Sequence, residues 1–316
     1  MVGLLPLLLL RPSVPYTLSM PRPLTALSLG DAGINGWVPL VAGDTEGALY
    51  APTPTGSNPI GRVPGRVIAL RCLNGMGEVP FVVAYAPPSG DERVELWRRV
   101  GGRGERSASL GTLPPDSRAL VALGRSGFAV GSVRGRGASL YDADGNALGR
   151  VALPEGVVGL ANAGDRDAGT AFVAALADGE ARAYGADGAV RWRRTLPIRG
   201  RLLDFEGRGE CAAWATDEAG GRVGVLNLMD GKPVGTAYAA PGVARAEALW
   251  SGLPLIVGGR AVDVRRHAAP WSFPAPVVAA DAGAARVAVA LADGTLVVRD
   301  PLRAWVRKGE AALLAP

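Results

Sequence analysis

Residues that could act as nucleophiles, bases or metal ligands are scarce in this sequence. His267 is the only histidine among 316 residues, so a Ser-His-Asp or Cys-His arrangement would have to use it. The same count excludes a histidine-rich metal site. His267 lies in the turn-like stretch RRHAAPW, where an exposed histidine without a catalytic role is the simpler interpretation. Cys72 and Cys211, the only cysteines, lie in apolar strand-like runs and are expected to be core thiols.

Carboxylates occur in several glycine-containing turns, where they could hold a cation. Calcium loops need oxygen ligands at alternate positions. Here arginine interrupts the pattern, since Arg208 stands among Asp204, Glu206 and Glu210. We therefore expect plain turns and no metal. A different arrangement would indicate an enzyme, namely convergence on one central pocket of four aspartates: Asp31, Asp165, Asp204 and Asp281.

Arginine carries nearly all of the positive charge, and the formal net charge is +5. Two arginine clusters are the candidate partner-binding residues: Arg98 and Arg99, and Arg191, Arg193 and Arg194. If the clusters lie close in space, they form a basic rim. We expect a protein partner. Nucleic acid or an acidic partner is an alternative, and a solvated outer face with local carboxylates explains the same residues without any partner.

The structural elements that position these residues can be inferred from an internal sequence repeat. A proline preceded by an apolar or small residue recurs about every 42 residues, the period of a four-stranded propeller blade. Proline cannot donate to a β-ladder, so it belongs where the outer strand of one blade leads to the inner strand of the next. The repeated pairs are Met20-Pro21, Val63-Pro64, Leu113-Pro114, Leu153-Pro154, Leu196-Pro197, Ala240-Pro241 and Phe273-Pro274.

Glycine-containing turns recur in step with these prolines. Residues 170–204 are the best-preserved copy, in which Asp178-Gly179 and Asp187-Gly188 separate short apolar runs and predict tight hairpin turns. We therefore predict an all-β fold, a seven-bladed β-propeller of four-stranded antiparallel blades. The unit that begins near Gly242 is short, so six blades plus an irregular segment is the alternative count.

The domain prediction is a single propeller over residues 22–316, preceded by an N-terminal segment, residues 1–21. The run VPYTLSMP resembles other fourth strands, and so does the C-terminal AWVRKGEAALLAP. We expect the N-terminal segment to close the last blade, because such closure hides an open sheet edge. Its apolar LLPLLLL is too short to span a bilayer. A cytoplasmic location is expected, and export is the alternative if this run is a signal peptide.

The run ADGEARAYGADGAVRWRRTLP, which includes Trp192, resembles the repeat of PQQ-like propellers. The runs SLGDAGINGWVPLVAG and LLDFEGRGECAAWA resemble FG-GAP (VCBS) repeats. These resemblances imply a propeller fold and no particular activity. The constellation with which PQQ-like members bind quinone and calcium is not found, so no cofactor is expected. WD40 repeats are not indicated, because one histidine cannot supply a repeated Gly-His.

The predicted function is a non-catalytic scaffold or protein-interaction module that binds through loops on a rigid ring. An enzyme with a site in the central channel (a quinoprotein-like oxidoreductase, lyase or hydrolase) is one alternative. The inner strands that would supply its polar residues are mostly Ala, Leu and Val. An exported carbohydrate- or ligand-binding propeller is the other alternative. Tryptophans such as Trp192 and Trp271 could stack on such ligands, although packing between blades explains them as well.

Overall fold

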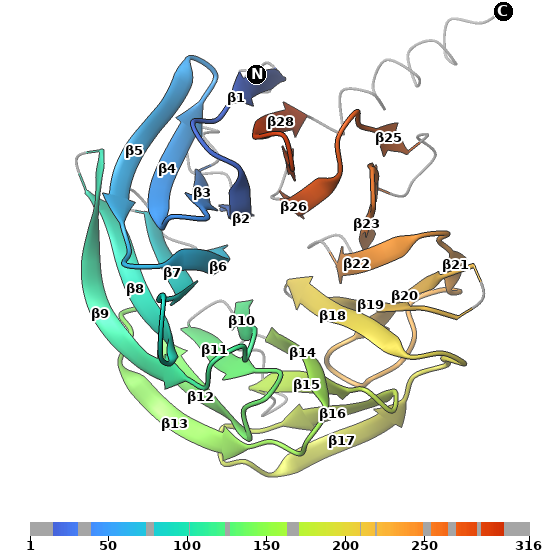
Figure 1. Ribbon diagram of the computed structural model, residues 1–316. Coiled ribbons are helices and arrows are strands. Elements are labelled where there is room, and N and C mark those ends of the chain that lie inside the picture. Colours follow the sequence, from blue (N-terminus) through green and yellow to red (C-terminus); the bar gives the residue numbers. More distant parts are fainter. Residues whose placement is uncertain are drawn as a thin grey trace, which may run out of the picture.

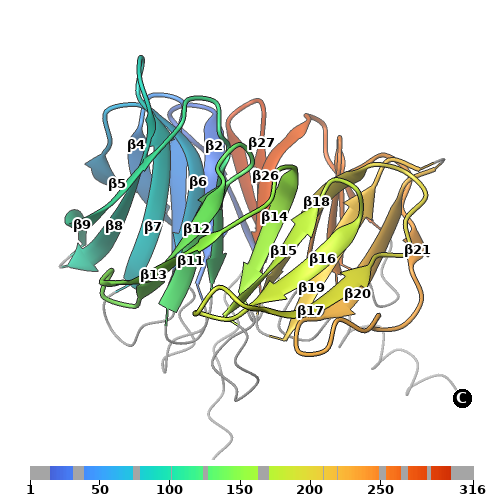
Figure 2. The same cartoon turned by 90° about the horizontal axis from the view of Figure 1, so that it is seen from below.

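The computed structural model describes residues 15–30, 39–73, 79–100, 102–123, 127–162, 171–208, 210–218, 220–248, 254–264, 270–282 and 286–299. Strands follow one another around a ring, and each group of four forms a twisted antiparallel blade (Figure 1). Seen from the side, the blades stand next to one another around the axis of the ring (Figure 2). This is the predicted seven-bladed β-propeller, and the count of seven blades is confirmed.

The first four blades are complete hairpin meanders in which the order in the sheet equals the order in the sequence. Their strands are β2 (Leu24–Leu29), β3 (Leu40–Asp44), β4 (Ala48–Thr53) and β5 (Gly56–Arg62); β6 (Arg66–Cys72), β7 (Val79–Ala86), β8 (Glu92–Val100) and β9 (Arg103–Leu113); β10 (Ala119–Leu123), β11 (Gly127–Ser132), β12 (Gly137–Asp142) and β13 (Ala147–Ala152); and β14 (Val157–Asn162), β15 (Phe172–Leu176), β16 (Glu180–Tyr184) and β17 (Val190–Thr195).

The last three blades are less regular, because two of them have outer strands of only two residues. The fifth blade comprises β18 (Leu202–Arg208), β19 (Cys211–Thr216), β20 (Arg222–Asn227) and β21 (Tyr238–Ala239), and the sixth comprises β22 (Val243–Ala248), β23 (Pro254–Gly258), β24 (Ala261–Val264) and β25 (Trp271–Ser272). The seventh comprises β26 (Val277–Ala282), β27 (Val287–Leu291), β28 (Thr295–Arg299) and β1 (Tyr16–Ser19).

The seventh blade takes its outer strand from the beginning of the chain. Strand β1 pairs antiparallel with β28, with Leu18 opposite Leu296. The amide of Met20 then donates to the carbonyl of Gly294, 2.9 Å away, before the chain enters the first blade. Both ends of the ring are therefore held in one sheet, which leaves no unpaired strand at the junction between the first and last blades.

The core is divided into seven apolar clusters, and each lies between two neighbouring blades. Between the fourth and fifth blades, for example, Ala175 and Leu196 pack with Phe205 and Trp214. Small residues face large ones across these clusters, so the sheets approach closely. Gly61 of the first blade illustrates this, because a Cβ atom built on it would lie 2.7 Å from a ring carbon of Trp97 in the second blade. Most of the strands that face a neighbour therefore read as continuous apolar runs.

The repeated prolines lie at the crossings between blades, as predicted. The residue before the proline points into the core, and Leu196, with 2% of its surface exposed, is typical. Its amide donates to Gly179 in the turn between the second and third strands, which ties the crossing to its own blade. The same bond recurs in five other blades, donated by Met20, Val63, Leu153, Ala240 and Phe273.

The fifth and sixth blades are joined by a direct pairing of strands. Their inner strands β18 and β22 pair directly in parallel, with Glu206 opposite Glu247 and Gly207 opposite Ala248. The two blades thus form one eight-stranded sheet. This pairing brings charged side chains of β18 next to those of β22, as in the ion pair between Glu206 and Arg245.

Candidate functional site

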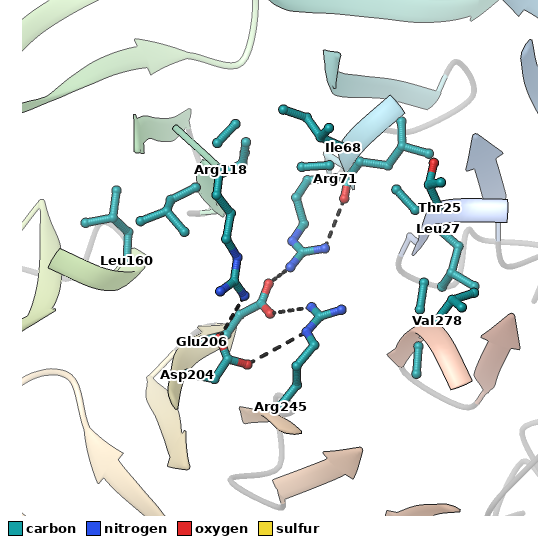
Figure 3. A pocket seen from close by; sticks show the side chains of 18 of the residues that line it. Thr25, Leu27, Ile68, Arg71, Arg118, Leu160, Asp204, Glu206, Arg245 and Val278 are labelled. Carbon is teal, nitrogen blue, oxygen red and sulfur yellow. Dashed lines mark hydrogen bonds and ion pairs between the residues drawn. The ribbon is translucent and has the colours of Figure 1, made fainter. Parts of the chain in front are cut away.

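The central channel contains a cavity of about 250 Å³ lined by residues of the innermost strands. The apolar residues in its walls include Ile68, Leu160 and Val278 (Figure 3), together with Leu120. Five charged residues also line it, namely Arg71, Arg118, Asp204, Glu206 and Arg245. They come from the second, third, fifth and sixth blades, so only closure of the ring brings them together.

The charged side chains form a connected network across the channel axis. Glu206 binds two arginines, Arg71 through its Oε1 and Arg245 through its Oε2 at 3.2 Å (Figure 3). Arg71 and Glu206 are 14% and 13% exposed, so this ion pair is largely withdrawn from water. Such a pair is costly to desolvate and is tolerated only when both partners are well bonded. The network therefore links opposite sides of the ring.

The ion pairs of Asp204 are longer than the ion pair between Glu206 and Arg245. Its two carboxylate oxygens each lie 3.8 Å from an arginine nitrogen, Oδ1 from Arg118 and Oδ2 from Arg245. These distances suit an ion pair but exceed a hydrogen bond. Oδ2 instead accepts the amide of Ala246 at 3.1 Å. The Nε of Arg245 is buried and has no hydrogen-bond acceptor among the described residues.

Arg118 enters the channel from a strained loop. Asp116 and Arg118 are the two described residues other than glycine with positive φ, at 54° and 50°. A conformation of this kind costs of the order of 1 kcal/mol and persists only where the surroundings impose it. Here the buried Glu92 accepts the Arg118 amide at 3.3 Å, and burial raises the pKa of Glu92 above its usual value. The loop presents the Arg118 side chain, 57% exposed, to the cavity.

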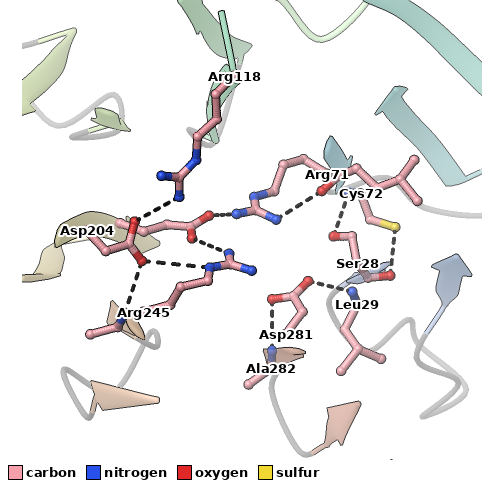
Figure 4. A network of polar contacts seen from close by, with 12 residues as sticks. Ser28, Leu29, Arg71, Cys72, Arg118, Asp204, Arg245, Asp281 and Ala282 are labelled. Carbon is pink, nitrogen blue, oxygen red and sulfur yellow. Dashed lines mark hydrogen bonds and ion pairs between the residues drawn. The ribbon is translucent and has the colours of Figure 1, made fainter. Parts of the chain in front are cut away.

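Further polar residues on the inner strands bond the backbone of the next blade. Asp281 accepts the amide of Leu29 at 2.7 Å, and Ser28 accepts that of Cys72 at 3.0 Å (Figure 4). Thr25 donates to the carbonyl of Val67 at 2.6 Å. These bonds hold neighbouring inner strands in register, so the residues that make them are structural. Asp281 consequently stands apart from the cavity, and only Asp204 of the four predicted aspartates lines it; Asp31 and Asp165 lie outside the described residues.

The predicted partner-binding arginines lie on the outer part of the ring, on two different blades. Arg98 and Arg99 belong to β8 in the second blade, where Arg98 pairs with Asp144 of the third blade at 2.5 Å. The other three, Arg191, Arg193 and Arg194, belong to β17, the edge strand of the fourth blade. The third blade separates the two clusters (Figure 1), so they do not form one continuous basic rim.

The tryptophans that are described fill gaps between blades. Trp97 is 7% exposed, packs between the first and second blades, and donates to Glu95 at 2.9 Å. Trp192 is half-buried and packs between the fourth and fifth blades. Trp271 is also partly buried, and the guanidinium of Arg299 lies 5.2 Å from its ring centroid. Each of these rings therefore has a packing role.

The cysteines have no disulfide partner. Cys72 is buried and its thiol contacts the Ser28 carbonyl, whereas Cys211 is half-buried, with a thiol pKa raised first by burial and then by Glu210. No group of three or more His, Cys, Asp or Glu side chains in the described ranges could hold a metal ion. His267 falls outside those ranges. The described part of the chain also contains no helix of the length and apolarity needed to cross a membrane.

Of the charged channel residues, the sequence pointed to Asp204, whereas the three arginines were missed because the inner strands were weighed as mostly Ala, Leu and Val. Arg71, Arg118 and Arg245 each appear as a single charge beside apolar runs, such as RVIALRC for Arg71. The sequence does contain a signal for these residues, because a charged residue inside the first strand of a blade faces either a neighbouring blade or the channel axis. Recognising the cluster required comparing the same strand position across all seven repeats.

Comparison with known proteins yields a likeness in structure only. No family model matches the sequence, and no curated protein matches it. Among solved structures, the WD40 β-propeller domain of Doa1 matches with a TM-score of 0.66 at 12% sequence identity, covering 91% of this chain and 97% of that chain. This identity shows a shared fold alone, and the WD40 sequence signature is absent here. The chain is a seven-bladed β-propeller.

Proposed function

We propose that the protein is a non-catalytic interaction module, a rigid ring that presents the outer strand of its fourth blade to a protein partner. The observation that carries this proposal is the exposure of β17. Five of its six residues are exposed, and three of them are arginines. Among the described outer strands, no other combines this exposure with this density of positive charge.

The arginines of β17 differ in how far the protein itself neutralises them. Arg191 pairs with Asp187 at 2.9 Å, and Arg194 lies close enough to Asp230 to help lower the pKa of that carboxyl, after Lys232. Arg193 has no carboxylate partner within the described residues. Arginine is enriched at protein interfaces, because its planar fork binds carboxylates and stacks on aromatic rings. β17 therefore offers one free and two partly satisfied guanidinium groups on a rigid edge.

The ring is suited to hold this strand still. Trp192, on the same strand, packs into the fifth blade, and Gly231 lies against both Trp192 and Arg194. The arginines thus sit on a strand that is anchored through its inward side. A rigid surface binds with less loss of conformational freedom than a mobile loop does.

The test is affinity capture from cells that naturally contain the protein, using the full chain. We expect wild-type protein to retain a defined partner, and the triple variant R191E/R193E/R194E to lose it. The matched control is R260E, because Arg260 is exposed in a turn of the sixth blade. A second arm, R98E/R99E, asks whether the second blade contributes. Equal capture by wild type and the triple variant would contradict the proposal.

The resemblance to PQQ-like repeats supports a finer proposal about origin. In the fourth blade the two Asp-Gly turns bracket β16, and Gly179 and Gly188 have φ of 86° and 80°, as tight hairpins need. We propose that the blades derive from a PQQ-like or FG-GAP-like repeat. The alternative of an enzyme with a channel site gains no support from the channel carboxylates, since arginine engages both Asp204 and Glu206.

A further inference from the structure

We propose that the central channel binds a small monocarboxylate, whose carboxylate group lies against the guanidinium groups of Arg118 and Arg245 on the cavity side of Asp204, and whose apolar tail lies against the channel wall. This site is separate from the partner surface of the fourth blade. It rests on three observations: the charge balance of the cavity, the donors beside it that make no hydrogen bond at normal length, and the strained loop that supplies Arg118.

The net charge of the residues that line the cavity favours a ligand with one negative charge. The cavity is lined by three guanidinium groups and two carboxylates, which leaves a net charge of +1. Two further acids of the inner strands do not line it. Asp281 uses both oxygens to accept backbone amides, from Leu29 and Ala282, and Glu247 is buried on β22 outside the cavity. A ligand with a single carboxylate would neutralise the net charge of +1, whereas a dianion would make the net charge of the site negative.

Two guanidinium groups beside the cavity have donors that make no hydrogen bond at normal length. Arg118 and Arg245 both lie 3.8 Å from Asp204, beyond hydrogen-bond length. For Arg245 the nitrogen at 3.8 Å is the buried Nε, which points at Asp204 and has no acceptor at hydrogen-bond length within the described residues. A buried donor without an acceptor costs about 1 to 3 kcal/mol, so an acceptor that reached it would be favoured. The fork of a guanidinium group matches a carboxylate in particular.

The cavity also restricts the size and character of the ligand. At about 250 Å³ it is smaller than the pockets of about 300 to 1,000 Å³ that hold drug-sized molecules. Its apolar residues include Ile68, Leu120 and Val278, and Val278 is 41% exposed. These side chains would cover a short aliphatic tail. Arg118 directly precedes β10, so the site lies toward the end of the channel at which the inner strands begin.

The strained loop gives Arg118 its position. Its left-handed φ is maintained by hydrogen bonds to Glu92 and from Val133, while its side chain remains more than half exposed. Strain that persists at an exposed cationic residue beside a cavity is typical of a binding site. Arg71 and Glu206, by contrast, already satisfy each other and would serve as the base of the site.

The test is isothermal titration calorimetry of the full chain with sodium acetate, propionate, butyrate and phosphate at constant ionic strength. We expect saturable binding of the carboxylates, about fourfold tighter for each added methylene. In R118Q the dissociation constant should rise at least tenfold. R118K should fall between, because it keeps the charge and loses the fork. The control R260Q, on the sixth blade, should bind as wild type.

Three results would overturn the assignment: unchanged butyrate affinity in R118Q, no saturable binding and no rise in thermal midpoint with any carboxylate, or tighter binding of phosphate than of butyrate. An unchanged unfolding midpoint for unliganded R118Q verifies that the variant is folded. Affinity capture with R118Q separates this site from the partner surface, since we expect its partner binding to equal that of wild type.

Discussion

At the scale of single residues, glycines that touch a large ring decide how closely two strands can pack. Gly224 on β20 faces Trp214 on β19, and a Cβ there would lie 2.3 Å from the indole. We expect Gly224→Ala to lower the free energy of unfolding by about 1 to 3 kcal/mol, because the indole is buried and cannot move aside. Gly259→Ala is the control, since nothing lies within 4 Å of its Cβ position. Urea denaturation measures both, and equal stabilities would contradict this account.

Buried tyrosines make stability depend on high pH. Burial, followed by hydrogen bonds to Asp44 and Glu95, raises the pKa values of Tyr50 and Tyr85 above 10.0. In the unfolded chain these hydroxyls ionise near 10.0, while the folded protein retains its protons. The contribution to stability is therefore complete below about pH 10 and is lost as pH rises through the folded pKa values.

Urea denaturation between about pH 8 and 11 measures this alkaline loss. The double variant Tyr50→Phe/Tyr85→Phe should lose less stability over that interval than wild type does, although it lacks two buried hydrogen bonds. Parallel pH profiles for the two proteins would show that other groups cause the loss.

At the scale of elements, β1 is the strand whose removal opens the ring. Leu18 packs into the cluster between the seventh and first blades, whereas Thr17 is exposed on the opposite side of the strand. We expect Leu18→Asp to cost about 2 to 4 kcal/mol, since it removes apolar contacts and brings a charge to a half-buried position. Thr17→Asp should change stability by less than about 0.5 kcal/mol. Thermal unfolding of both variants tests the difference, and a stable Leu18→Asp variant would show that closure depends on other contacts.

The elements were also the part of the structure most readily predicted from the sequence. Prolines and Asp-Gly turns act locally, so their spacing indicates strand ends without knowledge of the tertiary fold; Pro197 and Gly179 are examples. Short outer strands were harder to anticipate, because β21 and β25 have only two residues and lack a strong pattern. The channel cluster could not be predicted in this way, since Arg71 and Glu206 are distant in sequence and meet only across the closed ring.

At the scale of the whole molecule, the channel network is a connection between blades that are not neighbours in sequence. Glu206 of the fifth blade binds Arg71 of the second and Arg245 of the sixth. We expect Glu206→Gln to lower the free energy of unfolding by about 3 to 5 kcal/mol, because two arginines lose their counter-ion in a poorly hydrated channel. The matched control is Glu46→Gln, which loosens two exposed ion pairs and should cost less than about 1 kcal/mol. Similar losses for both variants would mean that the channel is well hydrated.

The pairing of β1 with β28 also has a consequence for synthesis on the ribosome. The residues of β1 are translated first, and their partners follow roughly 280 residues later. At about 5 to 20 residues per second, this strand waits roughly 15 to 60 s for its partner. Its alternation of half-buried and exposed residues, with Thr17 and Ser19 facing outward, limits the apolar surface that it offers meanwhile. The ring is therefore completed only after translation of the seventh blade, and until then the nascent chain is an open arc of finished blades.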